Sequence, residues 1–430
     1  MKRTPLRWLC LGLTIFAAPL AAQARVDQNV VYGMYSGLAL LMDVHHPAEP
    51  NGYGIIQIWG SGWHAPTAYG ARQLKWWGPR QIFLDAGYTV FTINHRAAPR
   101  FRYPAAVEDA QRAVRFVRHN AEQYGVDPDQ LGGWGHSSGG HLIAMLAVMD
   151  GDGDPDDPDP VNQASAKLQV VVAQAGVFDF AVLFDNPWPA SVNASFLGAP
   201  LRPGDPTYRA ASPITYVTPD DPPMLLIHGD DDQVVPFTQS EFMLAALEEH
   251  GIEARLIRIP GGGHGANDAP ETVRWLNRNL LGDVRAEALE SLLEAYSYLG
   301  EGGRLARAGD ISDALQAYQN ARERDARLTI QALSWNLLCW RGSLWGRAAE
   351  VMEACERAVA LAPDNGNIRD SRGLARALTG DRAGAIDDFE AYVAQTGSGR
   401  GRAQRLDWIA ALRSGENPFT AEVLDALREQ

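Results

Sequence analysis

The chain has 430 residues, 46% hydrophobic and 21% charged, with a formal net charge of −14. This balance excludes a disordered chain and provides core material for two or three domains, while the negative charge argues against nucleic acid or an anionic membrane as partner. The three cysteines are too few for a disulfide-rich scaffold or a cysteine-rich metal site.

The first 24 residues have the pattern of a signal peptide. Lys2 and Arg3 precede an apolar stretch over 8–20, and small residues stand at Ala22 and Ala24. The apolar stretch is shorter than the roughly 20 residues that a membrane span needs. We therefore expect cleavage after Ala24 and a periplasmic or secreted protein. No later segment is apolar enough to predict a membrane span after cleavage.

Residues 25–283 alternate short apolar runs with amphipathic ones. The runs predicted as strands are rich in Val and Ile and are bounded by Gly, Pro or Asp: 55–59, 88–93, 131–134, 168–174, 224–228 and 255–259. The helical patterns between them cover 69–86, 104–124, 139–148, 238–249 and 269–281. This alternation predicts a doubly wound, mostly parallel α/β sheet, and the runs 30–32 and 38–44 add antiparallel strands at one edge.

Residues 284–430 lack strand patterns and form a second, all-helical domain in this interpretation. Three glycines are each followed by small or aromatic residues at matching offsets: Gly309 with Ala314, Tyr318 and Ala321; Gly346 with Val351, Cys355 and Ala358; Gly380 with Ala385, Phe389 and Tyr392. The spacing resembles the 34-residue tetratricopeptide repeat, over about 290–395, followed by a helical cap. Such an array suggests a peptide or protein partner, or a clamp on the first domain.

Two cysteines fall on consecutive predicted helices of one repeat. A disulfide between Cys339 and Cys355 is one interpretation for an exported protein. We favour the other, in which two free cysteines are buried as small packing residues.

The strongest chemical motif is Gly-His-Ser-Ser-Gly-Gly over 135–140, between the predicted strand 131–134 and a helix. A G-x-S-x-G sequence in this context is a nucleophile elbow, a turn so tight that only small residues fit around the serine. It predicts Ser137 as a nucleophile at the carboxyl edge of the sheet.

A serine nucleophile needs a base and an acid, which follow it in the chain in this fold. The turn after strand 224–228 holds Asp230, Asp231 and Asp232, and His264 follows the next strand. His264 is the predicted general base, oriented by Asp232, with Asp230 as the alternative acid.

The other histidines near these motifs, His136, His141 and His228, are assigned structural or supporting roles. Neither an H-x-x-x-H pattern nor a Cys/His cluster is present, so no metal is predicted.

The oxyanion of a tetrahedral intermediate needs fixed hydrogen-bond donors. One is predicted to be the N–H of Ser138, directly after the nucleophile. The others are expected from the Gly-rich loop after the first parallel strand, where Ser61 and Gly62 are the candidates. The segment 178–200 is expected to form a short cap over the site.

Together these residues resemble the α/β-hydrolase superfamily, and within it the hormone-sensitive-lipase-like and feruloyl-esterase-like carboxylesterases. The resemblance covers about 29–282 and rests on the motifs GHSSGGHL at 135–142, NHRAAP at 94–99, YPAAVED at 103–109, HGDDDQVVP at 228–236 and GHG at 263–265. It implies hydrolysis of a small-molecule carboxylic ester through an acyl-Ser137 intermediate, without metal or organic cofactor.

Two positions depart from this family. Its oxyanion loop usually reads His-Gly-Gly-Gly-Trp, whereas this chain has Trp59 and Ser61 in place of the first His and the second Gly, and His95 stands where the family carries tyrosine. A side chain at Ser61 is compatible with a backbone donor only if its φ is negative. The hole is therefore expected to be displaced, or to be formed chiefly by Gly62.

Two other functions fit parts of the pattern. A peptidase of the prolyl-oligopeptidase type shares the fold and triad, but that class generally carries a β-propeller before the hydrolase domain. A helical-repeat binding protein with a weakly active hydrolase domain is the second alternative, and the complete set of Ser, Asp and His residues argues against it.

Overall fold

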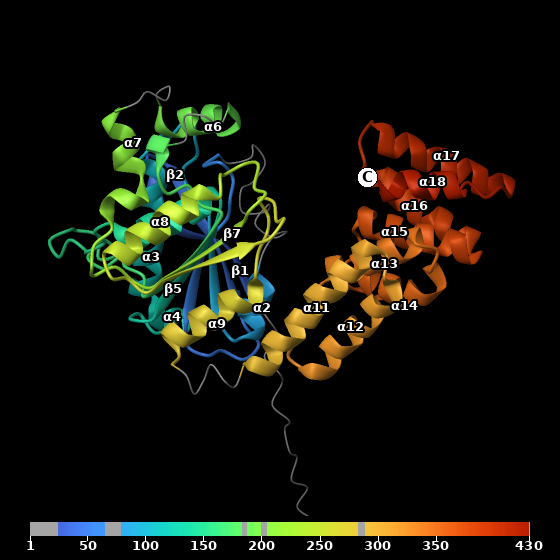
Figure 1. The fold of residues 1–430 in the computed structure, drawn as a ribbon, viewed down its shortest axis with the longest axis horizontal. Helices are drawn as coiled ribbons and strands as arrows, with labels where there is room; N and C mark the ends of the chain where they lie inside the picture. Colours follow the sequence, from blue (N-terminus) through green and yellow to red (C-terminus); the bar gives the residue numbers. More distant parts are fainter. Residues whose placement is uncertain (1–24, 65–78, 183–186, 199–203, 283–288, 430) are drawn as a thin grey trace, which may run out of the picture.

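The computed structural model describes residues 25–64, 79–182, 187–198, 204–282 and 289–429. The predicted signal peptide and most of the helix predicted over 69–86 lie outside these ranges. A sheet with helices on both faces comes first, and an array of helices extends from one side of it (Figure 1). Among the described residues no helix is both long and apolar enough to cross a membrane.

The sheet has eight strands in the order β1-β2-β4-β3-β5-β6-β7-β8. Their bounds are β1 Arg25–Tyr35, β2 Leu38–His46, β3 Gly54–Ile58, β4 Thr89–Ile93, β5 Leu131–His136, β6 Val170–Gln174, β7 Met224–Gly229 and β8 Ala254–Ile259. β1, β2 and β4 pair antiparallel and the remaining pairs are parallel, which confirms the predicted architecture. The inner parallel strands β3, β4 and β6 are buried along their whole length, as expected for strands covered on both faces.

Helices cover both faces of this sheet. They are α2 Arg80–Asp85, α3 Ala105–His119, α4 Ala121–Tyr124, α5 Ser138–Val148, α6 Pro187–Leu197, α7 Pro206–Ala211, α8 Thr238–Glu249 and α9 Ala269–Leu280, with 3₁₀ turns η1 Phe180–Val182 and η2 Pro213–Tyr216. One core packs α3, α5 and α8 against the sheet, and the other packs α2 and α9 against the opposite face. The helix predicted over 104–124 is divided at Asn120 into α3 and α4.

The second region consists of helices that pack in sequential pairs. Their bounds are α11 Glu290–Ala308, α12 Ile311–Arg324, α13 Ala332–Leu344, α14 Ala348–Leu361, α15 Gly366–Thr379, α16 Arg382–Gln395, α17 Arg400–Ser414 and α18 Ala421–Arg428. Gly309, Gly346 and Gly380 have φ values of +96°, +73° and +93° and lie between the two helices of each pair. Left-handed backbone of this kind favours glycine, which explains the glycine spacing in the sequence. The tetratricopeptide character of these pairs remains a prediction.

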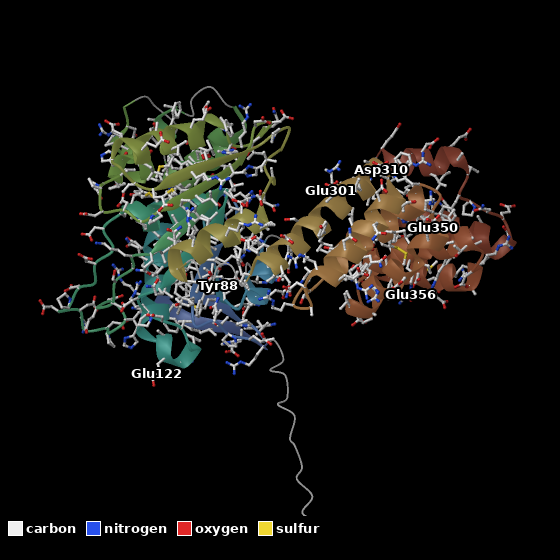
Figure 2. All side chains as sticks on the ribbon, turned by 60° about the horizontal axis from the view of Figure 1, so that its bottom comes forward. Tyr88, Glu122, Glu301, Asp310, Glu350 and Glu356 are labelled. Atoms are coloured by element: carbon white, nitrogen blue, oxygen red, sulfur yellow. A yellow bond between two sulfur atoms is a disulfide. The ribbon has the colours of Figure 1, made fainter. Side chains whose placement is uncertain are left out.

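Cys339 on α13 and Cys355 on α14 form a disulfide, with a Cα–Cα distance of 4.9 Å. Our preference for two free cysteines was wrong. The two residues do occupy buried positions of one helix pair, but they also face each other across it at a distance that suits a disulfide. Acidic side chains such as Glu350 and Glu356 project outward from this part of the array (Figure 2).

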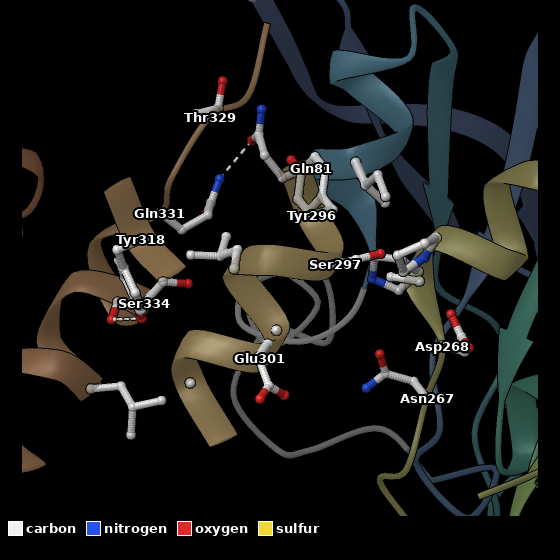
Figure 3. Close-up of a pocket in the computed structure, with 18 of the residues that line it drawn as sticks. Gln81, Asn267, Asp268, Tyr296, Ser297, Glu301, Tyr318, Thr329, Gln331 and Ser334 are labelled. Carbon is white, nitrogen blue, oxygen red and sulfur yellow. Dashed lines mark hydrogen bonds between the residues drawn. The ribbon is translucent and has the colours of Figure 1, made fainter. Parts of the chain in front are cut away.

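The two regions are joined by packing as well as by the chain. Leu292 and Leu293 of α11 are fully buried in the core cluster that also contains α2 and α9. At the end of α2, Asp85 Oδ2 accepts hydrogen bonds from the Tyr296 hydroxyl and the Thr329 N–H, both at 2.7 Å. A groove of about 560 Å³ with a mixed polar and apolar lining lies beside this contact. Figure 3 shows Gln331 reaching across it toward Gln81.

Candidate active site

The turn between β5 and α5 holds Ser137 in a conformation that its neighbours make possible. Ser137 has φ 57° and ψ −123°, a backbone conformation that residues other than glycine rarely adopt. A Cβ at Gly135 would lie 2.2 Å from the Gly139 carbonyl oxygen, and one at Gly139 would lie 2.0 Å from that of Ile58. The two glycines are therefore required for the close approach of backbone segments at this turn, as the motif predicts.

Ser137, His264 and Asp232 form a continuous chain of hydrogen bonds. Ser137 Oγ lies 2.9 Å from His264 Nε2, and His264 Nδ1 lies 2.7 Å from Asp232 Oδ2. With a proton on Nδ1, the imidazole donates to the carboxylate and accepts from the serine hydroxyl. The three side chains come from the ends of β5, β7 and β8, which meet at the carboxyl edge of the sheet.

The carboxylate of Asp232 is buried, and both of its oxygens are fully used. Oδ1 accepts the N–H groups of Val234 and Val235 at 2.8 and 3.0 Å, while Oδ2 accepts from His264 and from Nε2 of His228. Burial opposes ionisation, but hydrogen bonds from His228 and His264 outweigh it and hold the pKa of Asp232 well below its ordinary value. Asp232 is therefore ionised at neutral pH.

Asp230, the alternative acid, lies elsewhere. It accepts from Arg258 Nε at 2.7 Å and from the Gly261 N–H at 2.6 Å, on the exposed side of the turn. These bonds brace the loop that precedes His264.

Two residues hold the loop that carries His264. His136 Nε2 donates to the His264 carbonyl oxygen at 2.8 Å, and Gln174 Nε2 donates to that of Ala266 at 2.8 Å. Burial lowers the pKa of His136 to about 4, so its imidazole is neutral at pH 7. The nucleophile's own neighbour thus helps to fix the position of the base.

The predicted oxyanion donors differ in what their N–H groups do. The N–H of Ser61 donates to Ser138 Oγ at 2.9 Å, so it is engaged within the protein. Ser138 begins α5, where helical N–H groups have no intrahelical acceptor. For Gly62, no acceptor of its N–H is present among the described residues. Ser61 is not among the residues with positive φ, whereas Gly62 has φ +59°.

Trp59, the other departure from the family loop, packs edge-on against the buried Trp134 at 5.0 Å between ring centroids. Its side chain thereby belongs to the packing below the loop. His95 Nδ1 donates a hydrogen bond to the Arg96 carbonyl oxygen at 2.9 Å. Neither residue lines the cavity in front of Ser137.

A cavity of about 280 Å³ opens in front of Ser137 and His264. Apart from the residues of the elbow and the oxyanion loop, its wall is mostly apolar, with Val177, Val234 and Val235 among the lining residues. Val192 and Asn193 of α6 complete it, so the described part of the predicted cap does border the site.

The sequence predicted that Ser137, Asp232 and His264 act together, and His228 was assigned only a generic supporting role. It missed the specific bond from His228 to Asp232 and the presence of Asn193 in the cavity. The spacing of His228 and Asp232 around one turn was a usable signal for the first. Nothing local in the sequence marks Asn193.

The fold and this constellation define an α/β-hydrolase domain of the serine-hydrolase class. Residues 42–247 match the family model BD-FAE. The probable carboxylic ester hydrolase LipM of Mycobacterium tuberculosis (strain ATCC 25618 / H37Rv) is 29% identical over 234 residues, which are 52% of this chain and 52% of LipM. Esterase LipQ of the same strain is 30% identical over 233 residues, 51% of each.

A solved structure is also similar to this chain. The bifunctional GH43-CE of Bacteroides eggerthii has a TM-score of 0.50 to this chain at 28% identity, covering 59% of this chain and 38% of that one. The chain spans about half the length of the curated relatives it matches. The first region of the chain is thus similar to carboxylic ester hydrolases and to the BD-FAE family model, and an all-helical region follows it.

Proposed function

We propose that this protein is an exported serine carboxylesterase with Ser137 as nucleophile, His264 as general base and Asp232 as the orienting acid. The observation that carries the proposal is the continuous chain of hydrogen bonds from Ser137 Oγ through His264 to a buried, ionised Asp232. A serine hydroxyl is a weak nucleophile unless an adjacent base removes its proton, and this arrangement supplies that base.

The reaction proceeds in two halves. His264 Nε2 takes the Ser137 proton as Oγ adds to the ester carbonyl carbon, and the same nitrogen then protonates the departing alcohol. Water attacks the resulting acyl-Ser137 by the reverse proton path and releases the acid. Asp232 stabilises the imidazolium that exists between these transfers. The N–H groups of Ser138 and Gly62 face the negative charge on the carbonyl oxygen.

The cavity points to a carboxylic ester with a small acyl group. Its volume of about 280 Å³ and its valine-rich wall suit a short apolar chain. The names of the relatives, a carboxylic ester hydrolase and an esterase, support an ester as the substrate class. This route requires no metal and no organic cofactor.

Export is part of the proposal. The charge and hydropathy pattern of residues 1–24 supports a cleaved signal peptide, with domains over 25–283 and 284–430 in the periplasm or outside the cell. The Cys339–Cys355 disulfide supports an oxidising compartment, because such bonds are rare in the cytosol. The paired helices are proposed to be tetratricopeptide-like repeats that bind a peptide or protein.

The test is hydrolysis of p-nitrophenyl acetate by the wild-type protein and by Ser137→Ala. Loss of the nucleophile should lower kcat by on the order of 10⁴-fold to 10⁶-fold. Ser414→Ala, which changes an exposed serine of α17, is the matched control and should keep wild-type turnover. Equal rates in the wild type and Ser137→Ala would overturn the assignment.

A further inference from the structure

Helix α6 contributes a polar residue, Asn193, to the otherwise apolar part of the wall of the proposed active-site cavity. Asn193 is 1% exposed and lines the same cavity as Ser137 and Gly62. Its side-chain nitrogen Nδ2 is buried and has no hydrogen-bond partner among the described residues. Buried donors in native proteins are nearly always paired, so an unpaired one on a residue that lines the reaction cavity requires an explanation.

Asn193 lines the same cavity as the residues of the oxyanion loop. A Cβ at Gly62 would meet Val192 Cγ1 at 2.7 Å, so the preceding residue of α6 is packed against the backbone of this loop. One of the backbone donors predicted for the oxyanion is also already engaged, since the Ser61 N–H donates to Ser138 Oγ. A residue with an unpaired amide N–H therefore lines the cavity in which one backbone donor is already occupied.

We propose that Asn193 is a catalytic residue whose Nδ2–H completes the oxyanion hole together with the N–H groups of Gly62 and Ser138. The inference rests on the proposed serine-esterase function. When Ser137 Oγ bonds to the carbonyl carbon, the C=O electron pair moves onto oxygen, and Asn193 donates to that oxyanion. As the carbonyl re-forms and the C–O bond to the alcohol breaks, His264 supplies the proton to the leaving oxygen.

The surroundings favour the ester group over another polar part of the substrate as the acceptor. Beyond the elbow and the oxyanion loop, Val177, Val192, Val234 and Val235 line this cavity. A substrate hydroxyl in such a wall would lose its hydration for a single hydrogen bond. The ester carbonyl must enter, because Ser137 attacks it, and its oxygen becomes a stronger acceptor in the transition state.

Asn193→Leu removes the donor at nearly constant shape, and Asn193→Ala removes it with loss of volume. With p-nitrophenyl acetate and the full chain, both variants should lower kcat by about 10²-fold to 10³-fold and change KM by much less. The thermal midpoint of Asn193→Leu should stay at or above that of the wild type, because an unpaired buried amide is lost while the volume is kept. Val234→Ala, a cavity change without a polar atom, should act on KM instead.

A second readout does not depend on turnover. A p-nitrophenyl phosphonate that attaches covalently to Ser137 presents an anionic oxygen to the same donors, so Asn193→Leu should slow its attachment, followed by mass spectrometry, by a similar factor. A loss confined to KM, an attachment rate equal to that of the wild type, or a folded variant with unchanged kcat would overturn the proposal. A lowered thermal midpoint in both Asn193 variants would also overturn it, since the amide would then be structural.

The wild type and Ser137→Ala separate failure of this inference from failure of the proposed function. If Ser137→Ala abolishes turnover while Asn193→Leu retains it, the serine esterase stands and the role of Asn193 falls. If Ser137→Ala retains turnover, the result contradicts the proposed function itself, whatever Asn193→Leu shows.

Discussion

His228 Nε2 lies 3.0 Å from Asp232 Oδ2, the same oxygen that faces His264 Nδ1 at 2.7 Å. On the other side of its ring, His228 Nδ1 lies 2.7 Å from Ser240 Oγ. With the proton on Nε2, His228 donates to Asp232 and accepts from the Ser240 hydroxyl. A buried imidazole outside the proton path thus fixes the carboxylate that orients the base.

The first prediction concerns this positioning role. His228→Leu should leave Asp232 Oδ2 with His264 as its remaining donor and hold the carboxylate less firmly, lowering kcat/KM for p-nitrophenyl acetate by on the order of 10²-fold. His228→Gln keeps an N–H donor and should retain clearly more activity. A merely structural role would reduce folded protein in both variants equally, which circular dichroism would reveal. Activity of His228→Leu within about threefold of the wild type would contradict the prediction.

The second prediction concerns the oxyanion loop. Gly62→Ala forces a side chain onto a residue with φ +59°, which costs about 1–2 kcal/mol, and places its Cβ 2.7 Å from Val192 Cγ1. The loop should shift and kcat should fall. Adding Val192→Ala relieves the steric part, so the double variant should recover part of kcat. A double variant no better than Gly62→Ala would show that backbone strain alone is responsible.

The third prediction is an acid-sensitive stability from His141. Its ring is fully buried, with Nδ1 accepting from Trp63 Nε1 at 3.0 Å and Nε2 donating to the Ala211 carbonyl oxygen at 2.8 Å. Burial lowers the pKa of His141 from 6.5 to about 4. Because the folded pKa lies below the unfolded one, the free energy of unfolding is highest above pH about 6.5 and falls as the pH drops toward 4, by about 3 kcal/mol from this group.

Denaturant unfolding at pH 7 and pH 4.5 measures this loss. His141→Gln lowers the stability at both pH values but removes the titrating group, so its loss between them should be smaller than that of the wild type. An equal loss in both proteins would mean that other groups carry the acid sensitivity.

The fourth prediction concerns the disulfide between α13 and α14. Closing a loop of 16 residues stabilises a protein by about 3 kcal/mol in the chain-entropy account. The double variant Cys339→Ala/Cys355→Ala should therefore lower the unfolding temperature of the helical region while p-nitrophenyl acetate turnover at 25 °C stays unchanged. Reductant should destabilise the wild type and leave the double variant unaffected. Alkylation of both thiols in the unreduced protein would contradict the bond.

The sequence predicted the sheet well because its signals are local. Buried parallel strands such as β3 and β6 are mostly apolar, and their ends were located within one or two residues. The division of 104–124 at Asn120 was missed, since the apolar periodicity continues across it. The identity of the cysteine pair was visible, but its oxidation was not.

The sequence alone determined Ser137 and His264 of the proposed triad and favoured Asp232 over Asp230 as its acid. The elbow, the Asp-rich turn and the Gly-His-Gly loop each carry a short-range pattern, because tight turns restrict which residues fit. The tertiary structure decided which residues that are far apart in the sequence lie close together in the fold. It joined the Ser61 N–H to Ser138 Oγ, closed the Cys339–Cys355 bond and brought Asn193 into the wall of the cavity that Gly62 also lines. These contacts depend on how whole helices pack on the sheet, and packing depends on the shapes of many side chains at once rather than on any one motif.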